Sequence, residues 1–190
     1  LTLVPESDFL SQSQQLCAGK RVMVDADSAP VALRFAVEPQ GEIVWHADPI
    51  TAMKAHKNPI ELAGYRDSHH QDGVAWVNFL AWLAHEVPRR EASGQPITEL
   101  EAQAQQLLFR EQRPGFIEQS FATISASGSN AAMCHYHSSE QTNAAITRDH
   151  FYLNDSGGQY HNGTTDATRT LAFGPMSTQC RLHYTAVLKG

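Results

Sequence analysis

The 190-residue sequence contains few cysteines, and they form no pattern. Cys17, Cys134 and Cys180 are an odd number at wide spacing, and no Cys-x-x-Cys pair occurs. The spacing gives no disulfide framework. A reducing compartment, the cytoplasm, is therefore the simpler expectation.

The sequence also lacks long apolar runs and an excess of positive charge. No stretch approaches the ~18 apolar residues of a membrane-spanning helix, and no basic-then-apolar signal segment opens the chain. The net charge of −6 argues against nucleic acid and anionic membranes as partners. Because the sequence begins with Leu1 rather than Met, we expect the natural N-terminus to lie upstream.

The first part of the chain, residues 1–50, alternates between helical and strand patterns. Ser7–Ala18 predicts a short helix and Arg21–Asp25 a strand. Ala29–Val37 predicts a second helix and Glu42–His46 a second strand. This order is typical of an α/β unit, so we expect the C-terminal tail of an α/β domain here.

A second domain is expected over residues 51–190, beginning with a long helix. Asn58 is the predicted N-cap, Pro59 the first helical residue and Glu61 the capping-box partner. Pro88 is predicted to stop the helix. Apolar residues at helical spacing predict its buried stripe: Val74, Val77, Ala81 and Ala84.

A second helix and a first pair of strands are expected to follow. Thr98 and Glu101 predict a capping box for a helix that ends near Gln112. Its predicted apolar face comprises Leu100, Ala104, Leu107 and Leu108. Strands are expected at Phe121–Ser125 and Ala131–Tyr136, with a turn between them.

Near the end of the chain, the stretch Phe151–Thr170 (FYLNDSGGQYHNGTTDATRT) predicts a hairpin. Glycine and asparagine allow the turn, and the aromatic and β-branched residues on either side favour strands. Adjacent strands would bring Asp155 and Asp166 close together. Because neighbouring carboxylates repel each other, either a cation lies between them or one of them takes up a proton. Oxygen ligands of this kind suit Mn²⁺ or Mg²⁺. The alternative is ordinary turn chemistry, which explains most Asp and Asn residues beside glycines.

The segment DSGGQYHNGTTDATRT resembles the metal-binding hairpin of the creatinase/aminopeptidase P group of metallopeptidases, which have the pita-bread fold. The family pattern is D-S-G-x-Q-Y-x-x-G-T-T-D-x-T-R-T. The resemblance implies that Asp155 and Asp166 are two of five ligands of a dinuclear metal centre, with Asp166 bridging both ions. It also implies an α+β fold: two long helices and then antiparallel strands, the first part of a pita-bread catalytic domain.

Two further segments are similar to the same family. Residues 54–75 match the pattern of its first long helix, and we expect His69, His70 and Asp72 there to be surface or domain-contact residues. The family pattern F-x-T-I-x-x-x-G-x-N-x-A-x-x-H-Y matches residues 121–136, and its histidine falls on His135. The resemblance implies that His135 lies beside the metals and assists at the tetrahedral stage as a catalytic residue. His137 is a weaker substrate-side candidate.

For the whole protein, the resemblance implies a cytoplasmic, homodimeric Xaa-Pro aminopeptidase that releases the first residue of peptides with proline in second position. Two divalent ions are expected, Mn²⁺ before Zn²⁺ or Co²⁺. The family's remaining ligands, one His and two Glu, come later in its sequences, so we expect this chain alone to be inactive. The alternatives are a Xaa-Pro dipeptidase (prolidase) and a non-catalytic pita-bread binding protein.

Overall fold

The computed structural model describes residues 3–190, and its internal contacts divide the chain between Lys57 and Asn58. Each of the two units is described by itself. None of the helices within residues 3–190 is long and apolar enough to cross a membrane.

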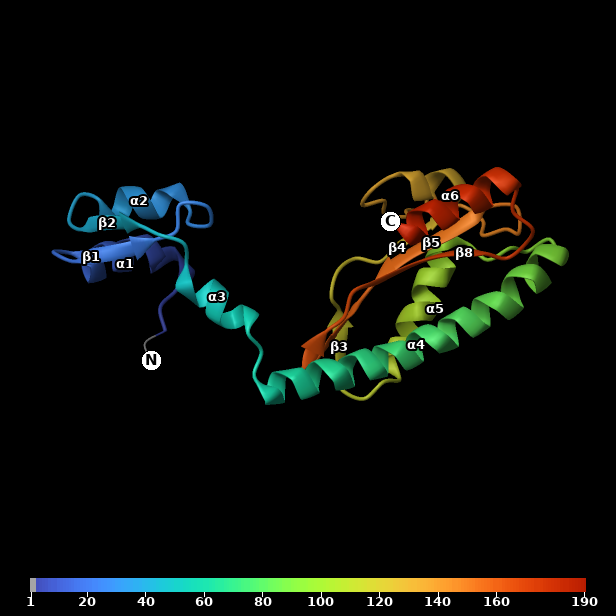
Figure 1. Cartoon of the computed structure of the whole chain (residues 1–190), viewed down its shortest axis with the longest axis horizontal. Coiled ribbons are helices and arrows are strands. Elements are labelled where there is room, and N and C mark those ends of the chain that lie inside the picture. Colours follow the sequence, from blue (N-terminus) through green and yellow to red (C-terminus); the bar gives the residue numbers. More distant parts are fainter. Residues whose placement is uncertain (1–2) are drawn as a thin grey trace. The chain divides into compact units, whose positions relative to one another are not determined.

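The first unit contains short helices and a two-stranded parallel sheet (Figure 1). Its elements are η1 (Glu6–Asp8), α1 (Phe9–Cys17), β1 (Arg21–Val24), α2 (Val31–Val37), β2 (Glu42–Trp45) and α3 (Pro49–Ala55). The four elements expected from the sequence are present with shifted ends. Helix α3 was not expected; Asp48 caps it by accepting a hydrogen bond from the backbone N–H of Ile50 at 2.9 Å. The assignment of residues 1–50 as the tail of a preceding α/β domain stays a prediction.

The second unit combines two long helices with two three-stranded antiparallel sheets. Its helices are α4 (Pro59–Ala92), α5 (Glu99–Glu111), η2 (Gly128–Ala132) and α6 (Thr178–Lys189). The strands are β3 (Phe116–Gln119), β4 (Ile124–Ser127), β5 (Phe151–Ser156), β6 (Gly158–Tyr160), β7 (Gly163–Thr164) and β8 (Ala167–Ala172). The sheet orders are β3-β6-β7 and β4-β5-β8.

Helix α4 begins as predicted and ends later than predicted. Asn58 and Glu61 form the reciprocal capping box. Pro88 does not stop the helix, which continues to Ala92. A proline removes one helical hydrogen bond, but Val87 beside it is fully buried. Tertiary packing therefore holds the last turns in place.

The buried face of α4 is not the predicted stripe. Val77 is 65% exposed, and the residues that turn inward include Trp76, Phe79, Leu83 and Val87. Both sets have helical spacing, but the larger side chains remove more apolar surface from water. Together with Tyr152 from β5 they belong to the main hydrophobic cluster.

Helix α5 has an inward face that is mostly polar, contrary to the prediction. Leu108 is 49% exposed, whereas Glu99, Gln106 and Arg110 are at most 1% exposed. Burial of such groups requires partners, and the structure supplies them from β4, β5 and α4. Thr98 caps the helix by accepting from the N–H of Glu101, but the Glu101 side chain pairs with Arg90 instead of returning a bond to Thr98, so only half of the predicted capping box forms.

The first predicted strand pair is wrong in part. The first strand is β4, shifted to Ile124–Ser127, and it pairs with β5. Residues 131–136 are not a strand: they form the end of η2 and a turn. His135 has φ of 56°, a left-handed conformation that a continuous strand does not contain.

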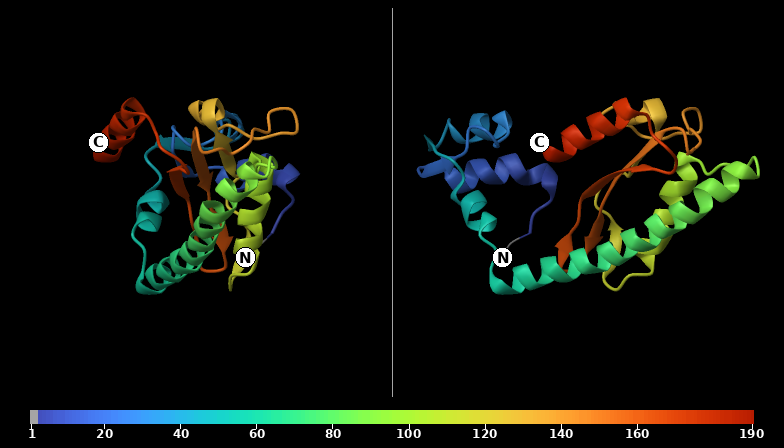
Figure 2. Two further views of the ribbon diagram at one scale, coloured as in Figure 1. Left: turned by 90° about the vertical axis from the view of Figure 1, so that its right-hand side faces the viewer. Right: turned by 45° about the vertical axis from the view of Figure 1, so that its right-hand side comes forward.

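The sheet β4-β5-β8 has α4 and α5 on one face and α6 on the other (Figure 2). On β5, Tyr152, Asn154 and Ser156 are buried toward α4 and α5. Because side chains alternate along a strand, Phe151, Leu153 and Asp155 face the opposite side. Phe151 stacks on Tyr184 of α6 with ring centroids 5.8 Å apart, which confirms this assignment of the faces.

We predict opposite effects of alanine at two glycines of this unit. A Cβ at Gly157 would meet the carbonyl oxygen of Thr165 and the Ser120 hydroxyl, whereas a Cβ at Gly73 meets nothing within 4 Å. Gly157→Ala should lower the free energy of unfolding by about 1–3 kcal/mol. Gly73→Ala should raise it by about 0.4–1 kcal/mol. Equal changes in the thermal unfolding of the two variants would contradict the close approach at Gly157.

Candidate metal centre

The two candidate ligands, Asp155 and Asp166, lie on the same face of one sheet. Asp155 is on β5 directly opposite Thr168 of β8, and Asp166 precedes β8 by one residue. Ala167 and Leu171 pack toward the helices. The alternate positions on β8 therefore face away from the helices, as Asp155 does. Asp166 is two residues from Thr168 and is thus the diagonal neighbour of Asp155.

The environment of Asp155 fits a cation ligand. Its Oδ1 is buried and has no hydrogen-bond partner among the described residues. An unpaired buried acceptor is costly unless a cation or proton satisfies it. Asp166 is exposed and on the same face, so a divalent ion could contact both carboxylates.

The hairpin turn that joins the two aspartates is fixed by close backbone contacts. The N–H of Thr165 donates to the carbonyl of Gly158 at 2.9 Å, and the Thr165 hydroxyl accepts from the Gly158 N–H at 2.9 Å. The Ser120 hydroxyl donates to the Thr165 carbonyl at 2.9 Å. Only a glycine at 157 leaves room for this arrangement. The residue before Asp166 is consequently held from several sides.

The tip of the hairpin rests on α4. Gly64 and Gly163 permit the approach, because a Cβ at either would meet Asn162 or Ser68. Asn162 donates to Asp67 at 2.8 Å, and this hydrogen bond lowers the pKa of the Asp67 carboxyl. Gly73 of the same helix has no such close neighbour, because a Cβ there would meet nothing within 4 Å.

A buried ion pair supports β5 from behind. Arg110 of α5 donates to Asp72 of α4 at 2.7 Å, and the two side chains are 1% and 4% exposed. Asp72 was expected to be a surface or domain-contact residue, but it is buried inside the second unit in this ion pair. Arg110 also donates to the Ser156 hydroxyl at 3.1 Å, and Ser156 donates to Asn154 at 2.9 Å. These bonds fix the residues on both sides of Asp155.

The same polar layer continues toward β4. Asn154 donates to the hydroxyl of Tyr152 at 3.1 Å, and that hydroxyl lies 2.8 Å from the Ser125 hydroxyl. Ser125 donates to the Glu99 carbonyl at 2.7 Å. Burial raises the pKa of Tyr152 to about 12, so the phenol stays protonated as a donor. The sequence offered no signal for this layer, because its members are far apart in the chain.

His135 lies in an exposed turn after η2. The next residue, Tyr136, packs with Ile124 and Ala126, against which Leu153 also rests. Ile124 is directly opposite Asp155 in the β4–β5 register, so these residues belong to the sheet face that carries Asp155. The turn containing His135 is thus anchored on the side of the carboxylate pair.

No other cluster among residues 3–190 competes with this pair. No group of three or more His, Cys, Asp or Glu in that part of the chain could hold a metal ion. His69 and His70 are exposed.

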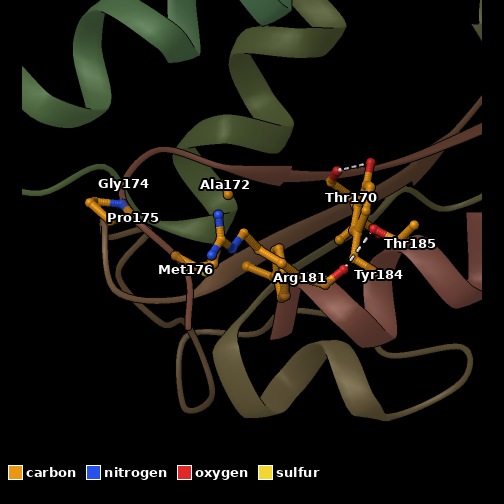
Figure 3. A pocket seen from close by; sticks show the side chains of 9 residues that line it. Thr170, Ala172, Gly174, Pro175, Met176, Arg181, Tyr184 and Thr185 are labelled. Atoms are coloured by element: carbon orange, nitrogen blue, oxygen red, sulfur yellow. Dashed lines mark hydrogen bonds between the residues drawn. The ribbon is translucent and has the colours of Figure 1, made fainter. Parts of the chain in front are cut away.

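A cavity of about 630 Å³ lies between β8 and α6 (Figure 3). Phe151, Thr170 and Ala172 line it, and by the alternation of side chains they share a sheet face with Asp155 and Asp166. Its lining includes Phe151, Met176, Arg181 and Tyr184 and contains no carboxylate. It is therefore not a second cation site.

Comparison with known proteins agrees with this geometry. Residues 63–190 match "Metallopeptidase family M24". The "Xaa-Pro aminopeptidase ApepP" of Drosophila melanogaster is 41% identical over 155 residues, which are 82% of this chain and 25% of that protein. An X-prolyl aminopeptidase from Caenorhabditis elegans, described as a cytosolic enzyme with a di-nuclear active site, has a TM-score of 0.81 and 32% identity. The match covers 96% of this chain and 29% of that one.

A prolidase from Pyrococcus furiosus shares the fold, with a TM-score of 0.75 and 19% identity over 100% of this chain and 52% of that chain. These likenesses define a metallopeptidase fold of the pita-bread type, as the sequence predicted. More narrowly, the chain belongs to metallopeptidase family M24. It spans about a quarter of the length of the curated relatives it matches.

We predict that removal of the buried carboxylate at Asp72 strongly destabilises the second unit. Asp72→Ala leaves the Arg110 guanidinium buried without its counter-ion, which should lower the free energy of unfolding by about 3–5 kcal/mol. Asp67→Ala, an exposed carboxylate on the same helix, is the matched control and should change stability little. Similar thermal shifts for the two variants would contradict a dominant role of the buried pair.

Proposed function

We propose that the full-length protein is a metal-dependent aminopeptidase that releases the N-terminal residue of peptides with proline in second position. The observation that carries this proposal is the carboxylate pair, Asp155 and Asp166, on one sheet face, with a buried unpartnered oxygen on Asp155. The names of the relatives at about 40% identity supply the substrate class. The proline specificity is carried over from those proteins.

In this proposal Asp155, Asp166 and His135 have separate roles in the reaction. Asp155 and Asp166 would hold the divalent ions, and the β5–β8 register places both carboxylates on one face of the sheet. When bound, the ions lower the pKa of a water molecule and polarise the scissile carbonyl. His135 donates a hydrogen bond from its imidazole to the oxyanion of the tetrahedral stage. The general base is expected to be a glutamate supplied from outside residues 1–190.

The finer properties are proposals as well. We propose Mn²⁺ as the metal, with Zn²⁺ or Co²⁺ as alternatives, because hard carboxylate oxygens suit such divalent ions. The name of the cytosolic relative and the three free cysteines support a cytoplasmic location. The net charge of −6 supports a peptide rather than a nucleic acid or membrane surface as partner. We also propose a homodimer, which sedimentation of the full-length protein would test.

A prolidase is the second candidate, because a prolidase has the same fold. Substrate length separates the two enzymes: an aminopeptidase cleaves Xaa-Pro-Yaa tripeptides, whereas a dipeptidase requires the free Xaa-Pro dipeptide. Exclusive cleavage of dipeptides by the full-length protein would favour the prolidase.

A non-catalytic binding protein is the third candidate. The partnerless Oδ1 of Asp155 argues against it, because a buried oxygen without a hydrogen-bond partner costs free energy that a bound cation would offset. Absence of saturable Mn²⁺ binding to the full-length protein would favour the binding protein.

Substitution of either aspartate should abolish metal binding and hydrolysis. Asp155→Asn and Asp166→Asn each remove a charged ligand, so Mn²⁺ affinity and activity should fall by more than the ~10–100-fold that loss of an outer hydrogen-bond partner produces. Calorimetric titration with Mn²⁺ and hydrolysis of an Xaa-Pro tripeptide measure both effects. Asp67→Asn, an exposed carboxylate at the hairpin tip, is the control that should retain both properties. The 190-residue chain alone should bind Mn²⁺ weakly and remain inactive.

Substitution of His135 should lower the rate constant rather than metal binding. His135→Ala removes the proposed oxyanion donor, and loss of one such donor lowers kcat by about 100-fold or more. His69→Ala removes an exposed histidine of α4 and should have no effect, and His137→Ala should have a smaller effect than His135→Ala. Loss of Mn²⁺ binding in His135→Ala would show that the histidine is a ligand instead.

A further inference from the structure

Glu99 is a fully buried carboxylate that the proposed reaction does not use. It is the first residue of α5 and is 0% exposed. Its Oε1 accepts from the Ser127 N–H at 2.6 Å and from Asn130 Nδ2 at 3.0 Å. Its Oε2 accepts from the Tyr136 hydroxyl at 2.7 Å and from the Ala144 N–H at 3.1 Å. Hydrogen bonds to an ionised acceptor are stronger than those between neutral groups. Four donors therefore fix the buried Glu99 carboxylate firmly in one position.

All four donors come from one stretch of chain, residues 127–144, and this stretch contains His135. Asn130 and Tyr136 lie on either side of the histidine in the chain, and Asn130 also donates to the Thr142 carbonyl at 3.2 Å. The Glu99 carboxylate therefore holds the two ends and the middle of this stretch close together. Apart from η2 it has no helix or strand of its own after Ser127, so its conformation depends on these bonds.

The backbone of His135 needs such a support. Its φ of 56° is the only positive value at a residue other than glycine within the described part of the chain. A strained conformation of this kind persists only where the surroundings determine it. Tyr136 is the adjacent residue, and Glu99 together with the cluster of Ile124 and Ala126 fixes its side chain at both ends.

We propose that Glu99 is a positioning residue: its carboxylate holds the 127–144 stretch so that the imidazole of His135 is directed to the substrate. The inference rests on the proposed function, in which His135 serves the oxyanion. It assigns the carboxylate no contact with substrate or metal.

The test compares Glu99→Gln with Glu101→Gln in the full-length protein. Glutamine preserves the size of the side chain, but its NH₂ group cannot accept hydrogen bonds from the donors that surround the carboxylate. A displacement of about 1 Å at a catalytic group lowers rates by up to ~100-fold. We expect kcat for an Xaa-Pro tripeptide to fall by roughly 10- to 100-fold, with KM and Mn²⁺ affinity unchanged. Glu101→Gln removes an equal charge two residues away, from a half-exposed side chain paired with Arg90, and should leave kcat unchanged.

A double-mutant cycle shows whether the effect passes through His135. In a His135→Ala background, Glu99→Gln should lower kcat by no more than about twofold, because the group it positions is gone. An equal loss in both backgrounds, or loss of Mn²⁺ binding, would overturn the proposal. Where Glu99→Gln does not fold, Tyr136→Phe removes one of the four donors and is put through the same cycle with the same criteria.

Hydrogen exchange separates this inference from the proposed function. The amides of Ser127 and Ala144 should exchange faster in Glu99→Gln than in the unmodified protein, whereas those of the β5–β8 ladder should not change. Slow exchange at both amides in Glu99→Gln would refute the anchoring itself. If anchoring is confirmed but the unmodified protein hydrolyses no Xaa-Pro peptide, the proposed function fails and the positioning role fails with it.

Discussion

The direction of the Asp155 carboxylate depends on the alternation of β5 between two environments. Tyr152, Asn154 and Ser156 are bonded into a buried polar layer that ends in the Arg110–Asp72 ion pair. In a strand, no single residue can change face without a shift of the whole register. The bonds behind the strand therefore also fix the residue that faces the other way. Directional polar partners resist such a shift more specifically than apolar contacts of the same volume would.

Helix α5 supports both parts of the candidate site. Arg110, near its end, lies behind β5, and Glu99, at its start, holds the stretch that carries His135. Eleven residues of helix separate them by about 16 Å. Because a helix is stiff over this length, α5 holds the carboxylate pair and the His135 turn in fixed positions relative to each other. The two charges are also placed favourably for the helix dipole, the glutamate at the N-terminus and the arginine near the C-terminus.

The parts of the fold that local sequence patterns specify could be predicted, and the parts that depend on distant partners could not. The Asn58 cap, the hairpin, and the placement of Asp155 on one strand with Asp166 at the start of its neighbour follow from turn residues and short-range spacing. The buried side of α5 does not, because Glu99 and Arg110 look like ordinary surface charges until Ser127 or Asp72 comes next to them. The strand expected at residues 131–136 was wrong for the same reason: contacts with Glu99 outweigh the local β-propensity.

The proposed metal site would couple cation binding to the stability of this fold. Two aspartates on one sheet face repel each other, and the buried oxygen of Asp155 has no donor of its own within the described residues. Folding must place these groups together before a cation can offset their repulsion. In the absence of metal, the favourable interactions of the polar layer behind β5 must therefore offset that repulsion. A ligand that binds only the folded state stabilises it. Cation binding at the proposed site would therefore act on one face of β5, and the Arg110–Asp72 layer acts on the other. Weakening the layer would make the fold depend more strongly on the bound cation.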